Sequence, residues 1–97
     1  MSLQKKIRIQ DRKLLDTFKA RLCCACGTGY LVDPAHLISV GAGGDDIETN
    51  VVPLCRTHHI ESHKIGLKKF AKKYPGFEME ITKKGWHFDK DKKLRRV

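Results

Sequence analysis

Cysteine and histidine residues gather in two short blocks of this chain, one near residue 25 and one near residue 58. The spacings Cys23-x-x-Cys26 and Cys55-x-x-His58 are those of metal-binding knuckles, in which a tight turn presents two ligands to one ion. A tetrahedral zinc ion takes four such ligands, and two knuckles supply them without any other residue. We therefore expect these four residues to hold a structural zinc ion that ties the two blocks together.

The length of the chain makes such a tie useful. Its 97 residues predict a single domain, 1–97, that buries too little surface to be strongly stable without help. The charged start, MSLQKKIRIQDRK, lacks the apolar centre of a secretory signal, so we expect a cytoplasmic protein with reduced cysteines rather than disulfides. No run approaches the ~20 apolar residues of a membrane span, so no membrane partner is expected. The alternative to a zinc site is that the cysteines are free, buried thiols. We expect this role for Cys24.

The net charge of +9 is unevenly distributed along the chain. Residues 1–22 contain seven Lys/Arg and two acids, residues 23–65 contain two and five, and residues 66–97 contain eleven and four. Basic flanks around an acidic, ligand-rich centre suit a polyanion such as DNA, bound mainly through its phosphates. A well-solvated surface is the alternative explanation for the lysines.

Apolar periodicity and breaker residues predict the order of local structure. In the first half we expect an amphipathic helix over Ile7–Leu22, then β-prone segments at Tyr30–Val32 and His36–Val40 that are broken by Asp33-Pro34. A glycine-rich loop over 41–46 and a strand over Asn50–Leu54 should follow. In the second half we expect a helix over His58–Tyr74, which Gly66 could divide, and a hairpin of Phe77–Ile81 with Trp86–Phe88. The tail from Lys90 onward is expected to be loose. Gly27 should supply the backbone angles that the first knuckle needs after its second cysteine.

Three histidines near the zinc ligands in sequence, His36, His59 and His63, are left over once those ligands are assigned. His59 and His63 lie four residues apart on an expected helix, so their rings share one face and can reach one metal ion. His36 lies at the start of a β-prone segment, where a rigidly held imidazole could activate a nucleophile. Solvated histidines at 59 and 63, and a hydrogen-bonded structural histidine at 36, are the alternatives.

The order of these motifs resembles that of an HNH endonuclease of the kind common in phages and mobile elements. The residues that carry the resemblance are Cys23-x-x-Cys26, Asp33-Pro34-Ala35-His36, Gly41-Ala42-Gly43-Gly44, the run from Asn50 to His59, and His63. They cover about residues 22–74, the expected core, between basic flanks 1–22 and 66–97. The resemblance implies an α+β fold, a ββα-metal domain of a β-hairpin and a helix around one divalent metal, here with a structural zinc, an N-terminal helix and a C-terminal β-hairpin.

The resemblance also implies catalytic roles. It makes His36 the general base, Asn50 the residue that orients it, and His59 a ligand of a catalytic Mg²⁺, Mn²⁺ or Ni²⁺ ion. Many HNH enzymes carry Asp or His just before the base histidine as a second metal ligand, whereas this chain has Ala35. We expect His63 to fill that place, with Asp33 as the second candidate.

Two functions from different classes follow. One is a metal-dependent DNA endonuclease in which His36 activates water and the metal on His59 stabilises the charge of the transition state. The other is a non-catalytic zinc-finger module that binds nucleic acid through its basic ends. The sequence is compatible with a monomer or a twofold homodimer.

Overall fold

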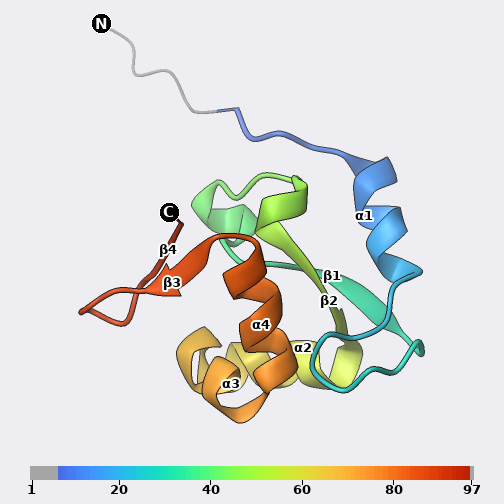
Figure 1. Cartoon of the computed structure of the whole chain (residues 1–97). Helices are drawn as coiled ribbons and strands as arrows, with labels where there is room; N and C mark the ends of the chain where they lie inside the picture. Colours follow the sequence, from blue (N-terminus) through green and yellow to red (C-terminus); the bar gives the residue numbers. More distant parts are fainter. Residues whose placement is uncertain (1–6, 97) are drawn as a thin grey trace, which may run out of the picture.

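A β-hairpin flanked by helices forms the centre of the structure, a computed structural model that describes residues 7–96 (Figure 1). In chain order the elements are α1 (Arg12–Lys19), β1 (Val32–His36), the 3-10 turns η1 (Val40–Ala42) and η2 (Glu48–Asn50), β2 (Val51–Cys55), α2 (Arg56–Ile65), α3 (Leu67–Lys73), α4 (Pro75–Lys83), β3 (Trp86–Phe88) and β4 (Leu94–Arg96). The fold is α+β with two small antiparallel sheets, and β1, β2 and α2 form the expected ββα unit.

The first strand runs through the Asp33-Pro34 pair, so the prediction of two segments broken there was wrong. In the β1–β2 register, Pro34 lies opposite Pro53. Hydrogen-bonded and non-hydrogen-bonded pairs alternate along an antiparallel ladder. The Arg56 N–H donates to Leu31 O and the Leu37 N–H donates to Asn50 O. Counting from these two pairs, Pro34 and Pro53 form a pair that exchanges no hydrogen bonds. Because neither proline has an N–H to donate, that is where a strand tolerates them.

Helices cover both faces of the β1–β2 hairpin. In Figure 1, α1 lies on one side of the hairpin and α2, α3 and α4 lie on the other. The predicted helix over His58–Tyr74 is divided at Gly66, whose φ of +84° is a conformation that favours glycine. The core around β2 is filled by large side chains that are almost fully buried. They are Leu54, Phe70, Phe77 and Ile81.

The C-terminal region contains a β-hairpin, but not the predicted one. Residues 77–81 belong to α4, in which Phe77 and Ile81 lie one helical turn apart and are both buried. Pro75 occupies the first turn of this helix, a position where a missing N–H costs nothing. The hairpin pairs β3 with β4, so the prediction of a loose tail from Lys90 was also wrong.

The N-terminal helix is shorter than predicted because Asp11 caps it. The Asp11 carboxylate accepts a hydrogen bond of 3.0 Å from the Leu14 N–H, so the helix starts at Arg12 rather than at Ile7. Residues 8–11 instead run along the glycine-rich loop. Within the described part of the chain, no helix is long and apolar enough to cross a lipid bilayer.

Candidate functional site

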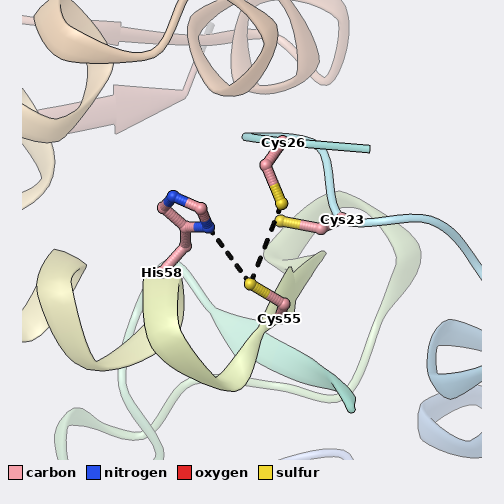
Figure 2. A group of neighbouring side chains, drawn as sticks. All are labelled: Cys23, Cys26, Cys55 and His58. Carbon is pink, nitrogen blue, oxygen red and sulfur yellow. Dashed lines mark hydrogen bonds between the residues drawn. The ribbon is translucent and has the colours of Figure 1, made fainter. Parts of the chain in front are cut away.

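Three cysteines and one histidine converge where the first knuckle meets the start of α2 (Figure 2). One donor atom from each of Cys23, Cys26, Cys55 and His58 lies within 4.8 Å of the other three. The sulfurs of Cys26 and Cys55 are 3.9 Å apart, and Cys55 Sγ lies 3.1 Å from His58 Nδ1. A tetrahedron with Zn–S bonds of about 2.3 Å has edges of roughly 3.8 Å, so this Cys₃His cluster could hold a metal ion such as zinc.

The local environment treats the clustered thiols differently from Cys24. Burial opposes ionisation of Cys23, but backbone amides around its sulfur, led by that of Cys55, outweigh it and lower the pKa. Burial raises the pKa of Cys55, a cost that a bound cation would offset. Burial also raises the pKa of Cys24, to about 12. Cys24 therefore remains a neutral thiol, as predicted, but it is half-buried rather than buried.

Backbone contacts fix the knuckle against β2 and α4. The Gly27 N–H donates to Cys23 O at 2.7 Å, and Gly27 has the predicted positive φ, +80°. The Cys24 N–H donates to Pro53 O on β2. A methyl group added at Gly76 would lie 2.3 Å from Cys24 O, so α4 packs directly on the knuckle backbone. The knuckle backbone is therefore held by contacts with two other parts of the chain, β2 and α4.

His36 is held by a buried carboxylate. Its Nε2 lies 2.7 Å from Oδ1 of Asp46, whose side chain is 5% exposed. Burial opposes ionisation of Asp46, but the Asp11 amide, His36 and Arg8 outweigh it and lower its pKa. An ionised carboxylate can only accept, so Nε2 carries the hydrogen and Nδ1 keeps the lone pair of the neutral ring. Within residues 7–96, no hydrogen bond to Nδ1 is found.

The segment before α1 completes this arrangement. The Arg8 guanidinium donates to the same Asp46 oxygen at 2.6 Å and to Gly44 O at 2.9 Å. The Asp11 N–H donates to the other Asp46 oxygen, and the Ile9 backbone bonds with Asp45 and Asp46. Sequence reasoning placed Asp46 only in a loop and residues 7–11 in a helix. No spacing rule links positions 8 and 46, so only the fold reveals this contact.

Asn50 ties the loop between β1 and β2 together. Its side chain accepts from the Ile38 N–H at 2.8 Å and donates to Ile38 O and to Asp45 O. In the described part of the chain, its side chain makes no hydrogen bond to the His36 ring. Any effect of Asn50 on His36 therefore acts through the loop that carries Asp46.

The other histidines lie near His36. A hollow of about 240 Å³, the central hollow, is lined by residues from β1, α2 and the start of α3, among them Ala35, His36, His59, His63, Gly66 and Leu67. The rings of His59 and His63 have centroids 5.0 Å apart. Oδ2 of Asp33 lies 3.3 Å from His59 Nδ1. The alternation of β1 puts Asp33 and Ala35 on the strand face toward α2, so the carboxylate approaches His59. Among the described residues, the donor atoms of Asp33, His59 and His63 do not form a group as close as the Cys₃His cluster.

Comparison with known proteins agrees with the order of these motifs. The chain belongs to the HNHc_6 family, described as "Putative HNHc nuclease", which it matches over residues 1–90. This confirms the HNH resemblance and places the chain in a family of nucleases.

A curated relative extends the comparison. The chain is 37% identical over 84 residues to "Uncharacterized protein YdfU" of Escherichia coli (strain K12). The match covers 84% of this chain but 23% of the relative, so this chain spans about a quarter of that protein's length. No solved structure matched the chain.

Proposed function

We propose that this chain is a metal-dependent endonuclease that hydrolyses phosphodiester bonds in DNA. The observation that carries the proposal is that His36, bonded to the buried Asp46, lines a hollow that His59 and His63 also line. Here the ring has a fixed tautomer, an available Nδ1 and potential metal ligands in the same hollow, as general-base catalysis requires.

His36 is the proposed general base. Its Nδ1 takes the proton from the attacking water, while Nε2–H remains bonded to Asp46. The ring becomes positively charged in that step, and the adjacent ionised carboxylate stabilises it. Arg8 keeps Asp46 ionised by sharing the same oxygen. Asn50 contributes by holding the loop that presents Asp46.

Asp33, His59 and His63 are the proposed holders of the catalytic metal. One carboxylate and two imidazoles are a donor set that suits Mn²⁺ or Ni²⁺ and admits Mg²⁺ with water in the remaining positions. When bound, the ion would stabilise the negative charge that develops on the phosphate oxygens. Asp33 lies two positions before Ala35, and its Oδ2 is 3.3 Å from His59 Nδ1. Asp33 therefore supplies the carboxylate that position 35 lacks. The sequence offered His63 and Asp33 as candidates for the second metal ligand, and the proposal keeps both.

The Cys₃His cluster is the proposed structural zinc site. It joins the first knuckle to the start of α2, the helix that carries His59 and His63. Zinc there would fix the position of this helix relative to the β1–β2 hairpin without taking part in the reaction. A soft thiolate-rich set next to a harder carboxylate–imidazole set would also direct different metals to the two sites.

Cleavage of supercoiled plasmid with Mg²⁺, Mn²⁺ or Ni²⁺ tests the proposal. We expect cleavage by the zinc-loaded protein, and we expect Asp33→Asn and His63→Ala each to raise the metal concentration for half-maximal cleavage about tenfold or more. Asp16→Asn, which removes an exposed carboxylate on α1, is the matched control and should leave that metal concentration unchanged. Protein that binds DNA but leaves it intact with every metal would instead be the non-catalytic zinc module.

A further inference from the structure

Two grooves adjoin the central hollow on different sides. The α1 groove shares His36 with the hollow and is lined on its other side by Arg8, Arg12 and Lys19. The α3 groove shares Gly66 and Leu67 with the hollow. Its remaining lining includes Lys68, Lys69, Lys72 and Lys92. The three depressions are thus linked by shared lining residues, and the line through them, called the path below, has cations at both ends and the histidines between them.

Apart from Arg8, which is paired with Asp46 in the α1 groove, the cations at the two ends differ from those that support the fold. Arg21 and Lys84 both contact Glu48, and Arg95 contacts Asp89, so these cations are neutralised within the protein. By contrast, no carboxylate of residues 7–96 lies within 4.0 Å of Arg12 or of any lysine that lines the α3 groove. Lys19 has one partner, the exposed Asp16, and such a surface pair contributes little.

The C-terminal hairpin brings Lys92 to α3 by a built turn. The Asp89 carboxylate accepts from the Asp91 and Lys93 N–H groups, and the Lys92 N–H donates to Asp89 O. Lys92 has a φ of +63°, a conformation that costs a lysine energy and that glycine or asparagine adopts more easily. The turn thus holds a lysine where its backbone is unfavourable, next to other lysines that repel it. A polyanion seated in the groove would offset the repulsion between these lysines.

We propose that one nucleic-acid strand crosses the protein along this path, from the α1 groove over the central hollow to the α3 groove. The proposal rests on the proposed nuclease function and adds where the substrate lies. The phosphate to be cut lies over His36 and His59, and phosphates on either side of it contact the two groups of cations. The hairpin of β3 and β4 is then a part of the substrate-binding surface and not only a closing element of the fold.

Salt-dependent DNA binding tests the path without using cleavage. Fluorescence anisotropy with a labelled duplex, in zinc-loaded protein without added catalytic metal, gives the slope of log affinity against log salt. Lys69→Gln/Lys72→Gln should reduce that slope by about 1.8, because each lost phosphate contact removes about 0.9. The matched control, Lys64→Gln/Lys83→Gln, changes the net charge equally on lysines outside both grooves and should leave the slope unchanged.

The second arm of the experiment tests the other end of the path. Arg12→Gln/Lys19→Gln should reduce the slope by a similar amount, and the two pairs should add when combined. A response from one end only would overturn the crossing, as would an equal loss in the control pair. Slope changes at both ends in a protein that cuts no DNA would uphold the path and reject the nuclease proposal. If the protein cleaves DNA but the test and control pairs do not differ in salt slope, the path is rejected and the nuclease proposal is upheld.

Discussion

Among glycine-to-alanine substitutions in the loop between β1 and β2, Gly44→Ala is expected to lower the stability of the protein most. The new Cβ would lie 1.8 Å from Ile38 O and 2.9 Å from Ser39 O. Ordinary contact begins near 3.4 Å, so atoms must move apart by about 1.6 Å. The obstacle is backbone, which cannot rotate away as a side chain would. The loop itself has to open.

The cost follows from what the displaced carbonyl does. Ile38 makes two hydrogen bonds with the Asn50 side chain, through its N–H at 2.8 Å and its carbonyl at 3.1 Å. Overpacking of this kind costs about 1–3 kcal/mol, and weakening the hydrogen bond of the displaced Ile38 carbonyl adds about 1 kcal/mol. A loss of roughly 2–4 kcal/mol in the free energy of unfolding corresponds to a fall in Tm of roughly 10–30 °C for a domain of this size. Asp46 lies two residues further on, so His36 should lose its partner as well.

Gly41→Ala is the matched control for this prediction. Gly41 lies in the same loop, but a Cβ there meets no atom within 4 Å. Calorimetric melts of both zinc-loaded variants, followed by plasmid cleavage, give the comparison. We expect Gly41→Ala to match the parent protein and Gly44→Ala to melt earlier and to cleave at least about tenfold more slowly. Equal melting temperatures and equal rates for the two variants would refute the reasoning.

Three further predictions concern the metal cluster and the buried carboxylate. Gly76→Ala would press on Cys24 O and should weaken zinc retention in a chelator competition, while leaving the DNA salt slope unchanged. Cys55→Ser should lose the zinc and unfold the domain, because structural zinc contributes on the order of 10 kcal/mol to small folds, and far-ultraviolet circular dichroism with metal analysis would show it. Because the pKa of Asp46 is lowered in the folded protein, its ionised form contributes stability at neutral pH. The stability gap between parent and Asp46→Asn should be constant above about pH 5 and shrink as pH falls through the folded pKa; a gap that widened toward acid would contradict this sign.

The sequence predicted the family and the metal cluster because both depend on local spacing. In each knuckle the two ligands lie within four residues of sequence. The structure brings together the predicted residues, Cys23, Cys26, Cys55 and His58. The possible break at Gly66 was also visible in advance, since glycine within a helical pattern is a local signal.

The failures concern features decided at long range. Pro34 looked like a strand breaker because its register opposite Pro53 depends on a partner 19 positions away. Phe77 and Ile81 fit either a strand face or a helix face over so short a run, and packing of Phe77 against Phe70 settles it as helix.

The contact between His36 and Asp46 was the most consequential feature that the sequence did not reveal. The two lie ten positions apart across a glycine-rich loop, and bonds from Asn50 to both parts of this loop help to return it to His36. Arg8 adds a contact from 38 positions away in sequence. An acidic pair after a glycine run is ordinary loop composition, so its role becomes visible only in three dimensions.

Single-turnover cleavage of plasmid DNA by His36→Ala, beside the parent protein at equal zinc content and equal DNA affinity, tests the central claim most directly. If His36 is the general base, cleavage should fall by about 10²–10⁴-fold with no change in melting temperature beyond a few degrees. Cleavage at the parent rate by a folded, zinc-loaded His36→Ala protein would contradict the account.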